Sequence, residues 1–443
     1  MARVSEKAII QNEELFNKIL PKYRRVLDQL ESDFTLREDT SLGRLVNFAS
    51  NKTIPKHNWF EYKQGYGEEL VRAIIQREKV SRRSYILDPF AGVGTTNLVA
   101  QSLGYKSIGF DINPVAHLAS VVKTSYFNGS QIGQISSLLQ SFLEKPQKFS
   151  SSFGEKVKVI ESSFRPSELK HLLAIKGFIE SLDSESMVQK FFNLAFLSII
   201  EDCSIRVKDG NGIKLKKNKK PVEDVFGYFN LKIARMLDDL KHCNSGTQAL
   251  LTNNTLLSSE CSLKDESIGL CIFSPPYANC FDYCEVYKLE FWFGGFVKTY
   301  SDFRRFREVA MRSHVNSQFD HSISKPIEEV EIVAEAVSAF NLWNKNIPHM
   351  IRGYFDDMFK LLKKLKPGML SNGKVFIVVA NSGYKGILVP TDLIICQIAK
   401  NLGFKVNHVV SARKIRASSQ QMDCLTTNYN NLMRESIIEL QKL

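Results

Sequence analysis

A glycine-rich turn between a short apolar strand and a helix constrains the fold of this chain most strongly. The turn is Asp88–Thr95 (DPFAGVGT); residues 85–87 before it predict a strand, and residues 97–103 after it predict a helix. A second strand over 107–110 follows and ends at Asp111. A strand–turn–helix–strand unit of this kind begins a doubly wound parallel sheet. The sequence therefore predicts an α/β, Rossmann-like fold with a mixed, mainly parallel sheet.

The pattern of apolar residues changes after this unit. From about residue 124 to 245 the period is that of helices, interrupted by one weak strand-like run at 157–160. This stretch predicts a helical insertion. Further strands are predicted at 249–252, 268–273, 374–380 and 404–410, with helices at 351–365 and 391–401.

The same pattern suggests how the chain is divided. The expected parts are an N-terminal helical extension (1–55), a half that holds the glycine turn (56–123), the helical insertion (124–245), a second half (246–425) in which 297–346 is a candidate recognition segment, and a C-terminal tail (426–443).

The amino-acid composition limits the kinds of protein to which this chain can belong. The 443 residues are 44% hydrophobic, which is ordinary for a globular chain, and they carry a net charge of +12. A basic surplus of this size favours a polyanionic partner, with nucleic acid as the first candidate, although a merely basic soluble protein has the same composition. The eight cysteines include no C-x-x-C pair, and residues 1–14 contain no apolar signal core. We therefore expect a cytoplasmic protein with reduced thiols and no metal site.

The glycine turn has the chemistry of a nucleoside-cofactor site. Gly92 and Gly94 let a ligand approach the backbone, and the helix start offers free amide protons. The carboxylate of Asp111 can accept from both hydroxyls of a ribose. The chain lacks the third glycine of a dinucleotide fingerprint, and Asp88 suits a cationic amino-acid group, so S-adenosylmethionine fits better; a tight turn without a ligand is the alternative. The candidate cofactor residues here are Asp88, Pro89, Phe90, Ala91, Gly92, Gly94, Thr95, Asp111, Ile112 and Asn113.

A second candidate site follows the apolar run at 268–273. Ser274-Pro275-Pro276-Tyr277 must end that strand, because proline cannot donate to a sheet ladder and fixes its own backbone angle. The stiff loop carries a hydroxyl, a carbonyl and an aromatic ring. That set suits a flat, amine-bearing ring such as an everted nucleobase. The alternative is a rigid turn with Tyr277 packed in the core.

Three basic segments are candidates for contact with DNA. The segment 208–220 reads as a glycine-containing basic loop, 300–312 mixes arginine with aromatics, and 413–416 follows the last predicted strand. A solvated surface, an amphipathic helix and a hydrogen-bonded loop are the respective alternatives. The candidate residues are Lys214, Lys216, Lys217, Arg304, Arg305, Arg307, Arg413 and Arg416.

With these motifs in place, the chain resembles the amino-methylating DNA methyltransferases of bacterial restriction–modification systems. Residues 88–94 are similar to their cofactor motif, 109–114 to the acidic strand end after it, and 274–277 to their catalytic loop in its cytosine-favouring form. Further matches lie at 380–382 and 418–421. The resemblance covers about residues 55–425. It implies the methyltransferase form of the Rossmann-like fold, S-adenosylmethionine as cofactor, double-stranded DNA as substrate and a cognate endonuclease as functional partner.

The resemblance also implies roles for single residues. The Ser274 hydroxyl and the Pro275 carbonyl would hold the exocyclic amine, and Tyr277 would stack on the base. The segment with His57, Trp59 and Phe60 would close over the cofactor. Asn253-Asn254 stands where the family often has an acid for the cofactor adenine, which leaves the adenine contact open, and Asn254 is the candidate cofactor residue there.

Alternatives remain open within this resemblance. Serine at position 274 favours N4-methylation of cytosine. The first alternative is N6-methylation of adenine by the same residues. An RNA or tRNA guanine methylase shares the proline–proline–aromatic loop. The third alternative is a non-catalytic DNA-binding subunit that keeps the cofactor fold.

Overall fold

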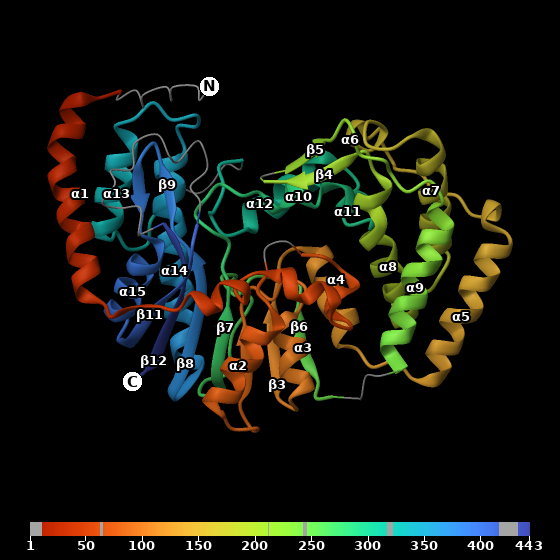
Figure 1. Ribbon diagram of the computed structural model, residues 1–443, viewed down its shortest axis with the longest axis horizontal. Helices are drawn as coiled ribbons and strands as arrows, with labels where there is room; N and C mark the ends of the chain where they lie inside the picture. The colour runs from red at the N-terminus through yellow and green to blue at the C-terminus, as the bar shows by residue number, and fades with distance from the viewer. Residues whose placement is uncertain (1–10, 63–64, 211, 242–245, 317–321, 416–432) are drawn as a thin grey trace.

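The computed structural model describes residues 11–62, 65–210, 212–241, 246–316, 322–415 and 433–443 (Figure 1). At its centre lies an eight-stranded sheet with the order β1-β11-β12-β8-β7-β2-β3-β6. β12 is antiparallel to both of its neighbours, and the other adjacent strands are parallel. The bounds are β1 (Leu36–Glu38), β2 (Tyr85–Asp88), β3 (Lys106–Phe110), β6 (Ala249–Thr252), β7 (Ile268–Phe273), β8 (Met369–Ala380), β11 (Phe404–Lys414) and β12 (Arg434–Lys442). The predicted α/β architecture with a mixed, mainly parallel sheet is confirmed.

Helices surround this sheet and extend beyond one of its edges. Figure 1 shows one group beside β11 and β12, a second near β2 and β3, and a third gathered past the β6 edge. The first group is α1 (Glu13–Asp33), α13 (Glu328–Ser338), α14 (Ile347–Gly368) and α15 (Thr391–Asn401); the second is α2 (Glu68–Glu78), α3 (Thr95–Ser102) and α4 (Pro114–Thr124); the third is α5 (Gly129–Glu144), α6 (Lys158–Glu161), α7 (Pro166–Glu180), α8 (Met187–Cys203) and α9 (Val225–Lys241).

Shorter elements lie above the carboxyl ends of the central strands. They are the helices α10 (Tyr283–Val286), α11 (Lys288–Phe293) and α12 (Tyr300–Val309), the ribbon of β4 (Arg206–Asp209) and β5 (Gly212–Leu215), and the pair β9 (Ser382–Tyr384) and β10 (Ile387–Val389). The segment 208–220, which was predicted to be a basic loop, therefore forms part of a β-hairpin. None of the described helices combines the length and apolar character needed to cross a membrane.

The strand order reverses between β2 and β7. From β2 the chain adds β3 and then β6 on one side, and it returns to place β7 and β8 on the other side of β2. In open parallel sheets, ligands bind in the crevice at such a switch point, beyond the carboxyl ends of the strands. The glycine turn leaves β2 and the Ser274 loop leaves β7, so the topology brings both predicted motifs to this crevice.

The two ends of the chain differ from expectation. The segment expected to be a C-terminal tail is instead β12, which lies between β8 and β11 inside the sheet. β1, within the expected helical extension, pairs with β11. The weak strand-like run at 157–160 lies largely in α6.

Candidate functional site

A cavity lies at the switch point, between the loops that leave β2 and β7. Its volume is about 1040 Å³, including the space at its open side. Residues from both predicted motifs line it: Pro89, Phe90, Ala91, Gly92, Thr95, Asp111, Ile112, Asn113 and Asn254 from the cofactor set, and Ser274 and Pro276 from the catalytic set. The predicted cofactor motif and the predicted catalytic loop therefore share one cavity.

The glycine turn has the backbone geometry that requires glycine. Gly92 and Gly94 have φ values of +52° and +80°, in the left-handed region. A Cβ atom at Gly94 would lie 2.7 Å from Cβ of Ser120 on α4, so this glycine also permits close packing of the turn on that helix. Gly94 itself does not line the cavity, and its role is to shape the turn.

Asp111 supports the turn from the end of the next strand. Its Oδ2 accepts a hydrogen bond from the Gly92 amide at 2.7 Å, and its Oδ1 accepts one from the Asn113 amide at 2.8 Å. Burial raises the pKa of Asp111 to about 6, although these two amide hydrogen bonds oppose the rise. Each carboxylate oxygen has a second lone pair, so Asp111 can still accept hydrogen bonds from a ligand in the cavity.

Asp88 has a different role from the one that the sequence suggested. The residue is 1% exposed and does not line the cavity. Its carboxylate accepts hydrogen bonds from the Tyr66 hydroxyl at 2.8 Å and the Phe90 amide at 3.0 Å, and burial raises its pKa to about 6. Because the Tyr66 hydroxyl also lies 3.4 Å from the Ile272 carbonyl, Asp88 and Tyr66 tie the end of β2 to the end of β7.

Tyr62 and Tyr66, which follow His57, Trp59 and Phe60 in an aromatic-rich loop, line the cavity, and the sequence analysis assigned neither of them a role. Tyr62 stacks on Tyr287 with a centroid distance of 5.2 Å, and a Cβ at Gly92 would lie 3.3 Å from the Tyr62 ring. His57, Trp59 and Phe60, which were expected to close over the cofactor, are buried in the interface with the helical insertion instead. The density of aromatics in this loop was the available signal, but it did not show which rings face the ligand.

The predicted catalytic loop, residues 274–277, is held by residues far away in the sequence. The Tyr277 hydroxyl donates to Oε1 of Glu435 at 2.5 Å, and Oε2 of Glu435 accepts from Nε of Arg413 at 2.5 Å. The Tyr277 ring is partly buried against the main core, so it is less exposed than the sequence suggested, and it does not line the cavity. Pro275 is buried. Glu435 lies on the missed strand β12, so no local sequence signal pointed to this contact.

The predicted DNA-contacting residues divide into three groups. Lys214, Lys216 and Lys217 are exposed on or after β5, and Arg304 and Arg305 are exposed on α12. Arg307 is only 13% exposed and pairs with Asp282 and Glu285, so it stabilises the cavity wall and is not available to phosphates. Arg413 is 42% exposed but paired with Glu435. Arg416 and the motif at 418–421 lie outside the described residues.

The cavity fits a nucleoside cofactor on structural grounds. The side-chain nitrogen of Asn113 is buried, lies in a residue that lines the cavity, and has no hydrogen-bond partner among the described residues. A buried donor of this kind requires a partner, which a ligand acceptor would supply. The Asp111 carboxylate suits ribose hydroxyls, and Pro89, Phe90 and Ile112 provide apolar surface for a flat ring.

Comparison with known proteins shows which family the chain resembles. A family model described as "DNA methylase" matches residues 12–121. The chain is 26% identical to the type II methyltransferase M.BsoBI of Geobacillus stearothermophilus, over 91% of this chain and 88% of that protein. It is 24% identical to M.AvaI of Nostoc sp. (strain PCC 7120), over 93% and 92% of the two chains, and 23% identical to M.MvaI of Kocuria varians, over 74% and 76%. The resemblance of this chain to the amino-methylating DNA methyltransferases of restriction–modification systems is therefore confirmed over most of its length.

Proposed function

We propose that this methyltransferase transfers the methyl group to the N4 amine of cytosine in duplex DNA. The observation that carries the proposal is the shared cavity, which Gly92 and Asp111 line from the β2 side and Ser274 and Pro276 line from the β7 side. Two ligands bound to these two walls would face each other. Such positioning accounts for up to about 7–11 kcal/mol of barrier reduction when the reacting atoms are aligned.

On the cofactor wall, Asp111 would accept hydrogen bonds from the ribose hydroxyls, and Asn113 would donate to an acceptor on the cofactor. The methyl group on the sulfonium is what the bound cofactor supplies. Tyr62 and Tyr66, which line the same cavity, would cover this site and limit the entry of water. These residues act by holding the donor in one orientation, and none of them needs to change its covalent state.

On the substrate wall, the exocyclic amine of the everted base would donate to the Ser274 hydroxyl and the Pro275 carbonyl. The amine is a poor nucleophile because its lone pair is delocalised into the ring. Acceptors held against its protons orient the amine and restore lone-pair character. Ser274 lines the cavity, which supports this role. A serine there, in place of an acid, is the residue that favours cytosine over adenine.

Methylation at carbon 5 of cytosine is disfavoured by the thiol in this cavity. That reaction needs a thiolate nucleophile, which forms when the pKa of a cysteine is lowered. Cys284 lines the cavity, but burial raises the pKa of its thiol to about 12. The thiol is therefore protonated near neutral pH, which supports direct methyl transfer to an exocyclic amine.

Glu435 would position the catalytic loop. Its carboxylate holds the Tyr277 hydroxyl on one oxygen and Arg413 on the other, so the plane of the tyrosine ring is fixed before DNA binds. Tyr277 does not line the cavity itself, but it follows Pro276, which does, so its ring would meet the everted base at the edge of the cavity. A ring with a fixed plane that stacks on a base contributes about 1–3 kcal/mol per base. That contribution roughly offsets the few kcal/mol needed to evert the base.

The nature of the methylated base tests the proposal. Duplex DNA incubated with the purified protein and isotopically labelled S-adenosylmethionine is expected to yield labelled N4-methylcytosine on digestion to nucleosides and mass spectrometry. Two controls are a Ser274→Asp variant, which introduces an acid at this position, and single-stranded RNA in place of DNA. Label in N6-methyladenine, or in RNA in preference to DNA, would overturn the assignment to cytosine.

The biological role that follows is protection of host DNA in a restriction–modification system. A cognate endonuclease, encoded by another chain, would then cleave the same sequence when it is unmethylated. We infer this role from the family, and it requires no physical contact between the two proteins.

A further inference from the structure

We propose that the β4–β5 ribbon is the element that enters the major groove of the DNA, and that Lys214, Lys216 and Lys217 make its contacts. This inference rests on the proposed function, because it assigns the surface that presents DNA to the cavity. It specifies which of the basic segments carries recognition and which groove that segment uses.

The ribbon stands apart from the central sheet. β4 and β5 pair only with each other, antiparallel, with Val207 opposite Lys214 and Arg206 opposite Leu215. The major groove of B-DNA is about 12 Å wide and admits an α-helix or a two-stranded β-ribbon of this kind. A ribbon that belonged to the sheet could not reach into a groove, whereas this one has its strands free of other strand partners among the described residues.

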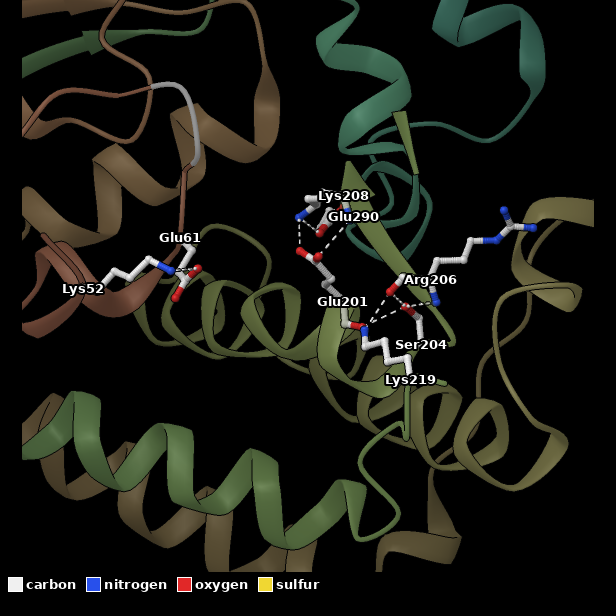
Figure 2. Close-up of polar contacts among 8 residues, drawn as sticks. All are labelled: Lys52, Glu61, Glu201, Ser204, Arg206, Lys208, Lys219 and Glu290. Carbon is white, nitrogen blue, oxygen red and sulfur yellow. Dashed lines mark hydrogen bonds and ion pairs between the residues drawn. The ribbon is translucent and has the colours of Figure 1, made fainter. Parts of the chain in front are cut away.

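Cations fix the ribbon to the protein both after its open end, through Lys219, and next to its turn, through Lys208 (Figure 2). Lys219 donates to the carbonyl oxygens of Glu201 and Arg206, and Lys208 lies between the carboxylates of Glu201 and Glu290. Lys208 is also 4.4 Å from the centre of the Tyr287 ring. These contacts hold the ribbon against α8 and α11, so that binding DNA would not have to order it.

A second set of contacts fixes the first residue of β4. Nε of Arg206 donates to the Ser163 hydroxyl at 2.7 Å, and a terminal nitrogen of Arg206 donates to the Ser162 hydroxyl at 2.9 Å. Arg206, Lys208 and Lys219 are thus occupied in fixing the ribbon. The cations that remain available to an external partner are the exposed lysines of β5 and of the residues just after it.

The exposed part of the ribbon is basic. Lys214 is 64% exposed, with a single surface ion pair to Asp209, and Lys216 and Lys217 are exposed immediately after β5. Leu215 between them is 59% exposed and adds an apolar side chain to this surface. Lysines bind phosphates and guanine edges, and an apolar side chain contacts the methyl group of thymine in the major groove. The combination is complementary to that groove.

The position of the ribbon relates it to the cavity. β5 contacts α10, and α10 supplies Tyr283 and Cys284 to the cavity wall. α12, which carries the exposed Arg304 and Arg305, contacts α10 as well. Figure 1 shows β4, β5, α10, α11 and α12 together above the carboxyl ends of the strands. DNA held by the ribbon would therefore lie next to the cavity that receives the base.

The test compares two triple variants of equal charge. One is Lys214→Ala/Lys216→Ala/Lys217→Ala on the ribbon; the other is Lys18→Ala/Lys22→Ala/Arg25→Ala on the exposed face of α1, beside the opposite edge of the sheet. Both lower the net charge from +12 to +9, so a general electrostatic effect is the same in both. In the ribbon variant, we expect the KM for DNA to rise about tenfold or more and kcat to stay within about twofold of the wild-type value. The slope of log Kd against log salt should fall by about 2–3. In the α1 variant, all three quantities should stay near the wild-type values. Equal effects in the two variants would overturn the proposal.

A base substitution in the DNA tests which groove the ribbon contacts. Replacing guanine by 7-deazaguanine within the methylated site removes a major-groove acceptor, and replacing it by inosine removes only a minor-groove amine. We expect 7-deazaguanine to weaken binding of the wild-type protein about tenfold and to have little further effect on the ribbon variant, with inosine nearly neutral in both. A loss that persists in the ribbon variant, or one that appears only with inosine, would contradict the major-groove assignment. These assays measure binding, so they remain interpretable even if the methylated base proves to be adenine and the proposed function fails.

Discussion

Replacing Tyr277 by alanine is expected to lower kcat/KM for methyl transfer to DNA by about 100-fold, while the Kd for S-adenosylmethionine changes less than about threefold. Loss of the stacking ring removes about 1–3 kcal/mol, and loss of the Glu435 contact frees a loop that positions the amine. The Tyr277 side chain does not line the cavity, so cofactor binding has no reason to change. Steady-state methylation of duplex DNA and calorimetric titration with cofactor measure the two quantities.

Two further variants separate the ring from its hydroxyl. Tyr277→Phe keeps the ring and loses only the hydrogen bond to Glu435, and Glu435→Gln removes the charge of the acceptor with little change in shape. Both are expected to lose about 3- to 20-fold in kcat/KM, and the double variant should lose little more than either single one, because both changes act on one contact. Full activity of Tyr277→Ala would show that this ring does not stack on the base, and an aromatic of the cavity wall such as Tyr283 would then be the candidate.

Replacing Asp111 by alanine is expected to weaken binding of S-adenosylmethionine by about 100-fold or more. The proposed hydrogen bonds to two ribose hydroxyls involve a charged acceptor, and each is worth about 1.5–3 kcal/mol, so their loss corresponds to at least about 3 kcal/mol. The same carboxylate supports the amides of Gly92 and Asn113, so the turn is also weakened. Thermal unfolding of the variant separates loss of binding from loss of fold. A change of less than fivefold would show that Asp111 does not contact the ribose.

The raised pKa of Asp111 gives the same interaction a pH dependence. Burial raises that pKa to about 6, so the carboxylate becomes protonated as the pH falls through 6. Cofactor affinity is therefore expected to be about tenfold lower at pH 5 than at pH 7, and Asp111→Asn should abolish this dependence, whereas Asp88→Asn should retain it. For stability the sign is the opposite: a carboxyl whose pKa is higher in the folded than in the unfolded chain contributes less as the pH rises between about 4 and 6.

The local sequence patterns predicted the central elements of the fold well. β6, β7 and α15 have the predicted bounds, because each is an unambiguous apolar run or helical pattern with clear ends. The two functional loops could be predicted as well, since glycines with positive φ and paired prolines act on the backbone locally. The topology then follows from the switch point, which brings the two loops together.

Contacts between distant segments could not be predicted in this way. β12 carries Arg434, Glu435, Ser436 and Glu439 beside its apolar residues, so its sequence does not predict a buried strand. Its charges are tolerated because each has a partner elsewhere, such as Asp392 for Arg434 and Tyr277 with Arg413 for Glu435. The burial of Asp88 could not be predicted for the same reason, since its partner Tyr66 lies in another segment.

The central claim is that the methyl donor and the target amine meet in the cavity between the ends of β2 and β7. The most direct measurement is an experimental structure of the protein with S-adenosylhomocysteine and a duplex that contains the methylated site. We predict the ribose at Asp111, the cytosine everted, and its N4 beside Ser274 and Pro275, with the amine about 3–3.5 Å from the position that the methyl carbon would occupy. A cofactor bound outside this cavity, or a target base everted into a different pocket, would contradict the account.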